Sequence, residues 1–261
     1  MFLHVKREVL DERLRVLLGG GGNSLVFAHG RDAFVTDPKM GDYALRVKRE
    51  VEDELGREVQ RVMLTHAHFD HAAGLKVFPS VPVVLVHPAA RDRLESKGVR
   101  ARFVEVEQEV QLNLGGEVVK VLNLGSGHTD GDLVAYLPGR KLLVTGDLFV
   151  GLDGVHVVPG DGGDISRLAD TLQRLVELDV ERVVPGHGAL TDKRALERVA
   201  AFLAELKRQV AEARAAGLSE DETAARVTLA DYADIGDFYG LDSREKNVRR
   251  MYKSLGGTGT R

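Results

Sequence analysis

The sequence contains no cysteine, no long uninterrupted apolar run and no long cluster of basic residues. Without cysteine, neither a disulfide framework nor a thiol nucleophile is possible. A membrane-spanning helix needs about 18 consecutive apolar residues, so no membrane partner is expected. The formal net charge is −4 and the basic residues are scattered, so no nucleic-acid partner is expected either.

The N-terminal stretch is apolar in part but is interrupted by the charged residues Lys6, Arg7 and Glu8. It therefore lacks the apolar core of a secretory signal peptide, and the sequence predicts a cytoplasmic protein. The chain has 261 residues, of which 43% are apolar. This length fits one large two-layer domain, or one domain with a small appendage, and the apolar content is enough for a sizeable core.

A dense group of polar residues follows the apolar run 62–64. His66, His68, Asp70 and His71 form an H-x-H-x-D-H motif. Zinc binds neutral histidine nitrogens and carboxylate oxygens, and a catalytic zinc site keeps one position open for water. Side chains alternate along a strand, so His66 and His68 can reach the same ion if the extended geometry continues into the loop. Because four ligands rarely fill two sites, more ligands are expected elsewhere in the chain.

Three further candidates follow at intervals along the sequence. They are His128 in Gly-Ser-Gly-His, Asp147 in Val-Thr-Gly-Asp, and His187 in Val-Pro-Gly-His. Taken alone, a histidine or aspartate at a strand end is more often a cap or a surface group. As an ordered set with the histidine cluster, these residues resemble the ligands of the metallo-β-lactamase-fold superfamily of metallohydrolases. The resemblance covers roughly residues 15–190, with all seven family ligand positions present.

This resemblance implies an α/β fold, namely the four-layer αββα metallo-β-lactamase sandwich with a C-terminal helical segment. Residues 1–190 would form the catalytic domain, and residues 191–261 would pack on its core. The implied cofactor is a pair of zinc ions (Zn²⁺), with iron or manganese as alternatives. Within the ligand set the resemblance assigns His66, His68 and His128 to the first ion, Asp70, His71 and His187 to the second, and Asp147 to a bridge between them.

Two metal ions about 3.5–4 Å apart can share a water molecule and lower its pKa towards neutrality. The resemblance therefore implies a metallohydrolase whose metal-bridged hydroxide attacks a small-molecule ester, thioester or lactone. Asp70 would be catalytic as well as a ligand, because it faces the bridging water and can accept its proton.

Two alternatives remain open. A mononuclear Fe(II) persulfide dioxygenase would use two histidines and one carboxylate, here His66, His128 and Asp147. A hydrolase with promiscuous β-lactamase or phosphodiesterase activity is the second alternative. Dedicated β-lactamases of the superfamily carry Cys or Ser where Asp147 stands. The nucleic-acid-processing branch has a large insertion between motifs, whereas only 18 residues separate His128 from Asp147.

Some residues outside the seven have two interpretations. His156 lies in the glycine-rich stretch 151–163 and either binds substrate at the pocket mouth or is a solvated loop histidine. Residues 19–22 are four consecutive glycines, either a loop beside the metal site or a plain hairpin turn. The basic segment 244–253 either contacts an anionic substrate or forms a solvated helix face.

The neighbours of His128 and the C-terminal aromatic residues raise similar questions. Thr129 and Asp130 are expected to orient ligands rather than to react. Tyr232, Phe238 and Tyr239 either line an apolar pocket or belong to the core.

The hydrophobic pattern predicts strands interspersed with helices. The predicted strands cover residues 14–18, 25–28, 33–36, 61–65, 83–86, 103–106, 117–122, 133–137, 141–145 and 182–184. The predicted helices cover residues 42–55, about 88–95, and a segment starting after Asp164, which serves as its N-cap. From residue 191 onward the pattern is helical.

Overall fold

The computed structural model describes residues 4–78 and 83–256. Its strands form one seven-stranded and one six-stranded sheet. The first sheet contains β1 (Lys6–Val9), β2 (Leu14–Leu18), β3 (Ser24–His29), β4 (Asp32–Thr36), β5 (Glu58–Met63), β6 (Val83–Val86) and β7 (Phe103–Glu105), in that order. The second contains β13 (Thr191–Asp192), β12 (Arg182–Pro185), β11 (Leu142–Gly146), β10 (Val134–Leu137), β9 (Glu117–Leu122) and β8 (Glu109–Leu114), again in spatial order.

Helices connect and cover the strands. The α-helices are α1 (Ala44–Arg49), α2 (Phe69–Ala72), α3 (Pro88–Ser96), α4 (Ile165–Val176), α5 (Lys193–Ala215), α6 (Glu220–Arg226) and α7 (Arg244–Gly256). Short helical turns are η1 (Gly41–Tyr43), η2 (Glu50–Glu54), η3 (Ala73–Val77), η4 (Pro138–Arg140), η5 (Gly151–Asp153), η6 (Pro159–Asp161) and η7 (Ala230–Tyr232).

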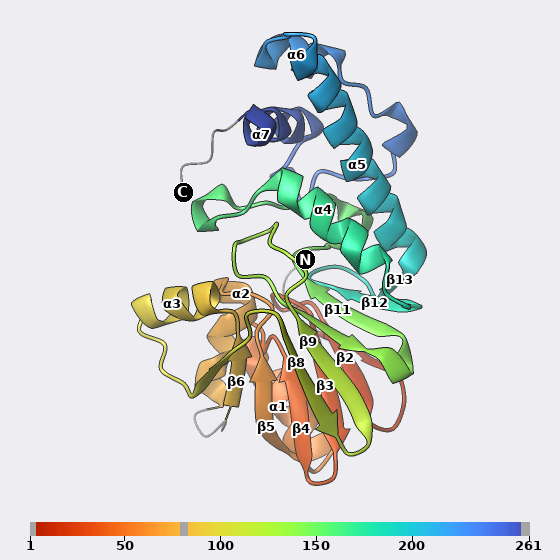
Figure 1. Ribbon diagram of the computed structural model, residues 1–261. Helices are drawn as coiled ribbons and strands as arrows, with labels where there is room; N and C mark the ends of the chain where they lie inside the picture. The colour runs from red at the N-terminus through yellow and green to blue at the C-terminus, as the bar shows by residue number, and fades with distance from the viewer. Residues whose placement is uncertain (1–3, 79–82, 257–261) are drawn as a thin grey trace.

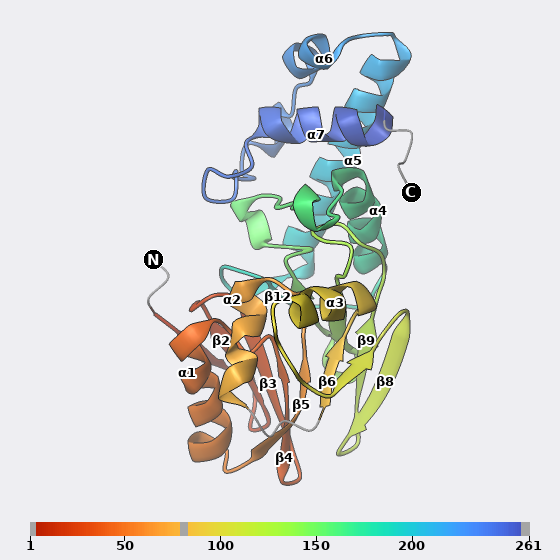
Figure 2. The same ribbon diagram turned by 90° about the vertical axis from the view of Figure 1, so that its left-hand side faces the viewer.

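The elements stack in four layers, with the two sheets face to face and helices outside each sheet (Figure 1). Helices α1, α2 and α3 lie against the seven-stranded sheet, as the rotated view shows, while α4 and α5 lie against the six-stranded sheet (Figure 2). The predicted αββα sandwich is therefore confirmed. Each sheet buries both faces, which is the reason that most of its strands read as apolar runs.

The core follows the same layering. Phe27 and Phe34 are fully buried between the sheets, together with Val121 and Leu142 from the opposite sheet. Truncating one of these phenylalanines to alanine would cost about 3–5 kcal/mol through lost burial and the cavity left behind. Separate apolar clusters fill the space between each sheet and its helices, so that three hydrophobic layers hold the four structural layers together.

Most predicted elements are present. Helix α4 begins after Asp164, whose side chain accepts a hydrogen bond of 2.8 Å from the backbone N–H of Arg167, as an N-cap should. The predicted helix over 42–55 is present as η1, α1 and η2 in succession. Strands β1, β8 and β13 are absent from the prediction, although β8 has alternating exposure. The predicted helical pattern from residue 191 is wrong at its start, because Thr191–Asp192 form β13 and α5 begins at Lys193.

The predicted strand 61–65 is wrong at both ends, because β5 covers Glu58–Met63. The strand ends before Thr65 because of one hydrogen bond. The backbone N–H of Thr65 donates to the Asp37 carboxylate at 2.8 Å instead of to a neighbouring strand. The chain therefore leaves the sheet just before His66, and the following residues are free to turn above the strand ends.

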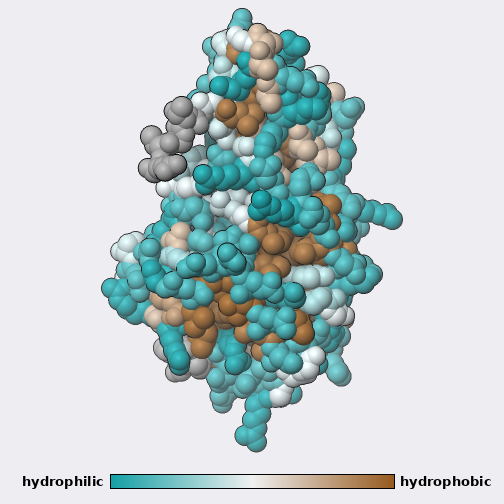
Figure 3. All heavy atoms as spheres, in the orientation of Figure 1, coloured by the Kyte–Doolittle hydropathy of each residue, from teal (hydrophilic) through white to brown (hydrophobic). Residues whose placement is uncertain are grey.

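Helices α5, α6 and α7 form the upper part of the molecule in Figure 1, beyond α4. Helix α5 has 23 residues and is amphipathic, with Leu196, Leu203 and Leu206 buried. Within the described residues, no helix is long and apolar enough to cross a membrane. The face drawn in Figure 3 is mostly hydrophilic, with hydrophobic residues gathered at mid-height.

Candidate metal centre

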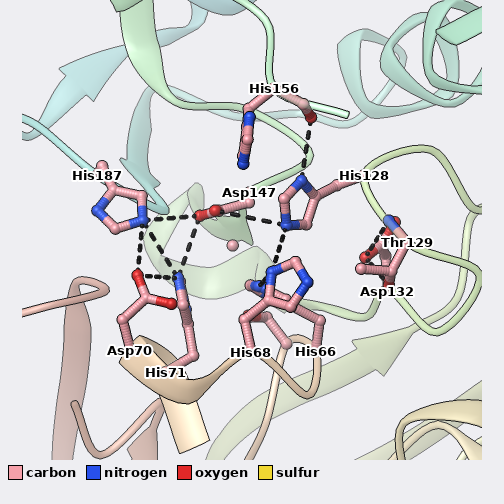
Figure 4. Close-up of polar contacts among 12 residues, drawn as sticks. His66, His68, Asp70, His71, His128, Thr129, Asp132, Asp147, His156 and His187 are labelled. Carbon is pink, nitrogen blue, oxygen red and sulfur yellow. Dashed lines mark hydrogen bonds and ion pairs between the residues drawn. The ribbon is translucent and has the colours of Figure 1, made fainter. Parts of the chain in front are cut away.

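The seven predicted ligands meet at one end of the sandwich, where strands of both sheets finish (Figure 4). The histidine cluster follows β5 of the first sheet. Asp147 comes directly after β11, and His187 comes two residues after β12. Because β11 and β12 run parallel, their carboxyl ends lie side by side, and this brings Asp147 and His187 together.

The first group contains His66, His68, His128 and Asp147. The Nδ1 atom of His68 lies 3.0 Å from Nε2 of His66 and 2.9 Å from Nε2 of His128. Asp147 Oδ2 is 3.5 Å from the same His128 nitrogen. One nitrogen from each ring thus converges on one small volume.

The second group contains Asp70, His71 and His187. The Nε2 atoms of His71 and His187 are 3.4 Å apart, and Asp70 Oδ2 is 3.2 Å from Nε2 of His187. Asp147 Oδ1 is 3.2 Å from His71 Nε2 and 3.4 Å from His187 Nε2. The Asp147 carboxylate therefore lies between the two groups and turns one oxygen towards each.

The buried carboxylate of Asp147 and the histidine nitrogens around it form a set of ligand atoms that suits metal cations. Asp147 Oδ1 is buried and has no hydrogen-bond partner in the part of the chain that the structure describes. Burial by itself raises the pKa of Asp147, but the rings of His187, His71 and His128 outweigh it and hold that pKa well below its usual range. A buried, ionised oxygen facing several imidazole nitrogens is the arrangement in which metal ions satisfy otherwise uncompensated groups.

The pKa values of the histidines differ because their surroundings differ. Burial lowers the pKa of His66 strongly and that of His128 to about 3, so both rings are neutral, as metal ligation requires. Burial also acts to lower the pKa of His71, yet Asp147, Asp37 and Asp70 raise it well above its usual value. The negative charge of these carboxylates therefore stabilises a positive charge in the second group, which either a proton on His71 or a bound metal ion can supply.

Asp37 is a buried residue that the sequence analysis does not identify. Its Oδ2 atom is 2.8 Å from Nδ1 of His71 and accepts a 2.6 Å hydrogen bond from the Thr65 hydroxyl. The contact leaves His71 Nε2 directed at the site. Such outer contacts fix the tautomer and orientation of a ligating histidine.

Two rings of the first group, those of His68 and His128, are held in the same way. His68 Nε2 is 2.9 Å from Asp161 Oδ2, and His128 Nδ1 is 3.0 Å from the backbone carbonyl oxygen of His156. The Nδ1 atom of His66 is likewise 3.0 Å from the Thr65 hydroxyl oxygen, so each of the three rings directs one nitrogen into the group while its other nitrogen has a partner outside it.

Thr129 and Asp130, which are predicted to orient ligands, make their side-chain hydrogen bonds and ion pairs to other residues of the described part of the chain than the ligand rings. Thr129 donates from its hydroxyl to the buried Asp132 at 2.6 Å, and Asp130 pairs with Arg93. These contacts shape the loop that carries His128. The ring itself is held by the backbone carbonyl of His156.

The glycine loop 19–22 joins β2 to β3 and also lies against the site, so both interpretations of it hold in part. A Cβ atom on Gly22 would fall 2.3 Å from the His71 ring, which leaves room only for glycine. The Lys39 ammonium donates to the carbonyl oxygens of Leu17, Gly19 and Gly22 at 2.6–2.9 Å. Burial lowers the pKa of Lys39 to about 7, and the three carbonyls give its ammonium form the acceptors that it needs.

His156 lies in the loop after β11, on the opposite side of Asp147 from Asp70 and His71 (Figure 4). Its Nδ1 is 2.7 Å from Oδ2 of the buried Asp242, and its ring stacks on Phe238 with a centroid distance of 4.6 Å. Phe238 also lies 5.7 Å from the His187 ring, centroid to centroid, and its backbone has a positive φ of 43°. The C-terminal segment therefore contributes part of the wall above the centre.

The basic segment 244–253 has its charge largely neutralised within the chain. Arg249 pairs with Asp221 at 2.6 Å, and Lys253 pairs with Glu220 at 3.4 Å. Lys246 and Arg250 both pair with Asp242. These contacts favour a structural role for the helix over binding of an anionic substrate. Tyr232 packs against the core, whereas Phe238 faces the site.

Comparison with known proteins agrees with the fold. The profile of the metallo-beta-lactamase superfamily matches residues 17–187, and the chain belongs to that superfamily. It is 32% identical over 175 residues to the human acyl-coenzyme A thioesterase MBLAC2, covering 53% of this chain and 60% of that protein. It is 31% identical over 135 residues to a hydroxyacylglutathione hydrolase of Rhodobacter capsulatus, covering 50% of this chain and 48% of that one.

Among solved structures, a metallo-beta-lactamase from Pontibacter korlensis superposes with a TM-score of 0.68 at 20% identity, covering 77% of this chain and 99% of that chain. At this identity the likeness concerns the fold alone. The profile match alone makes this chain a member of a metallohydrolase superfamily, and the convergent His and Asp residues imply a metal cofactor.

Proposed function

We propose that the protein is a dinuclear zinc hydrolase of a small thioester, ester or lactone, with a cytoplasmic location. The observation that carries the proposal is the placing of the Asp147 carboxylate between two groups of convergent ligand atoms. His66, His68 and His128 would hold the first ion. Asp70, His71 and His187 would hold the second. Asp147 would contact both. Residues 1–190 would form the catalytic domain, with the segment 191–261 completing the wall.

Two divalent ions bound there would lower the pKa of a water molecule and polarise the substrate carbonyl. The protein side chains then have separate tasks. Asp70 is the most exposed carboxylate among the ligands, at 34% for its side chain, and so it faces the open side of the centre. Burial alone raises its pKa, but His71 and His187 bring that pKa to about 2, so Asp70 is ionised, as a metal ligand requires. Its proposed role as proton acceptor rests on its position at the open side of the centre.

We propose that His156 contacts substrate. Asp242 accepts from its Nδ1–H and thereby fixes the ring, while Phe238 supports one face. A substrate approaching the centre would meet the ring edge of His156 and the ring of Phe238. An acyl group would suit this partly apolar wall. The thioesterase and hydroxyacylglutathione hydrolase names of the two relatives support a thioester as the first substrate class to test.

Metal analysis of the purified protein tests the proposal directly. We expect about two zinc ions per chain, loss of turnover on chelation, and recovery when zinc is restored. A panel of acyl-thioesters, lactones, phosphodiesters and β-lactams should show highest kcat/KM for a thioester or lactone. One iron per chain with oxygen consumption on a glutathione persulfide would instead identify the dioxygenase alternative. A metal-free, folded protein that hydrolyses thioesters would contradict the proposal.

A further inference from the structure

A cavity lies away from the ligand atoms, between α2 with η3 and the end of α3. Its volume is about 620 Å³, which is within the range for small-molecule sites. The floor is apolar and consists of the buried side chains Ala67, Ala72, Leu75, Phe78 and Leu94. Phe69, which is 66% exposed, stands at its edge. A large exposed aromatic ring beside an apolar cavity is the kind of surface that a ligand covers.

The charged residues that line this cavity are all basic. Its lining includes the basic residues Lys76, Lys97, Arg100 and Arg102 and no acidic residue. None of the four forms an ion pair with a carboxylate among the residues that the structure describes, and the Arg100 guanidinium bonds only to the backbone carbonyls of Glu95 and Val99. The basic residues of α7 behave differently, because most of them pair with acids. In a chain of net charge −4, this excess of positive charge is a local feature.

The cavity is on the opposite side of the ligand loop from the metal centre. The Ala67 side chain packs into the apolar layer that contains Ala72, Leu75 and Leu94. The rings on either side of it in sequence, His66 and His68, instead converge on His128. A molecule in the cavity would thus touch the rear of the loop without reaching the ligand atoms.

We propose that this cavity binds an amphipathic organic anion, with an apolar chain over Phe69 and the buried floor and an anionic head among the four cations. A carboxylate, a sulfonate and a phosphate ester share this chemistry. Arginine and lysine at the rim would bind the head group, and burial of the apolar chain on the cavity floor would add to the affinity. The site does not depend on the proposed hydrolysis, because no metal ligand takes part in it.

Binding of decanoate to the purified, metal-loaded protein tests the site. Titration calorimetry below the micelle-forming concentration should give saturable binding at one site, and decanesulfonate should bind similarly. Decyltrimethylammonium, which has the same chain and the opposite charge, should bind at least about tenfold more weakly because it meets four cations. Methyl-labelled alanine and leucine should show shifts at Ala67, Ala72, Leu75 and Leu94 in the NMR spectrum.

The matched variants are Lys97→Glu/Arg100→Glu at the rim and Arg167→Glu/Arg194→Glu on α4 and α5, all at exposed positions. The rim variant should weaken decanoate binding at least about tenfold, because two attractive charges become repulsive, while the distant variant should leave it unchanged. Circular dichroism checks that both variants fold. Equal binding by both variants, equal binding of the cationic amphiphile, or methyl shifts confined to the metal centre would each overturn the proposal.

Discussion

Replacing Asp37 by asparagine isolates one contact of the candidate metal centre. The Asp37 carboxylate makes three hydrogen bonds. Its Oδ1 accepts from the Thr65 backbone N–H at 2.8 Å. Its Oδ2 accepts from the Thr65 hydroxyl at 2.6 Å and lies 2.8 Å from His71 Nδ1. Asparagine keeps the shape and one oxygen. It also tolerates the positive φ of 43° that Asp37 adopts, so the backbone should not change.

The expected effect follows from hydrogen-bond roles. With the amide oxygen kept on the Thr65 N–H, the new NH₂ group faces Nδ1 of His71, and two donors cannot share that position. The ring would then favour the tautomer with its proton on Nε2, the atom directed at the centre. Loss of such an outer contact lowers metal affinity by about 10–100-fold, which is about 1.4–2.7 kcal/mol.

Competition with a chromophoric zinc chelator measures this effect. Asp37→Asn should lose affinity at the site of His71 and retain it at the site of His68. The matched control is Asp161→Asn, which removes the 2.9 Å contact to His68 Nε2 and should weaken the other site. If Asp37→Asn binds two zinc ions as tightly as the unchanged protein, or if both variants lose the same ion, the reasoning about outer contacts is refuted.

The remaining predictions use single substitutions with metal content and steady-state kinetics as readouts. Asp147→Ala should abolish binding of both ions and reduce kcat below about 1%, because the carboxylate that faces both groups of ligands is gone. Gly22→Ala should lower affinity for the second ion at least about tenfold, since its Cβ would fall 2.3 Å from the His71 ring. His156→Ala should keep both ions and raise KM; metal loss equal to that of Asp147→Ala would show that His156 is misassigned. Asp70→Asn should reduce kcat by about two orders of magnitude with the fold intact, and near-normal turnover with two bound ions would contradict the proposed proton transfer.

The sequence was sufficient to predict the family fold and to select the seven residues that converge. His66, His68, Asp70 and His71 form a local motif, and a residue type repeated at such short spacing is visible without a structure. Helix α4 was equally predictable from the sequence, because the spacing of its apolar residues and its N-cap Asp164 are local signals. In both cases the information lies within a few positions of the residue concerned.

The outer contacts could not be predicted because they join distant parts of the chain. Asp37 meets His71 across 34 positions, Asp161 meets His68 across 93, and Asp242 meets His156 across 86. Aspartate is common on surfaces and in turns, so nothing local distinguishes these three from solvated residues. Strand β8 is different, since Val110, Leu112 and Leu114 alternate with polar residues and give a period-two signal.

The ligands come from both sheets, and this placement links the metal centre to the stability of the sandwich. His66 and His71 follow β5 of the seven-stranded sheet, whereas Asp147 and His187 follow β11 and β12 of the six-stranded sheet. The two sheets approach closely at this end, because a Cβ on Gly146 of β11 would fall 2.4 Å from the hydroxyl oxygen of Thr65, which follows β5. A bound ion shared by these residues would join the two sheets at their common edge. An ion that binds only the folded chain stabilises it by about 2.7 kcal/mol when the free ion concentration is a hundred times Kd. The same ligand atoms would therefore contribute both to the reaction and to the free energy of unfolding.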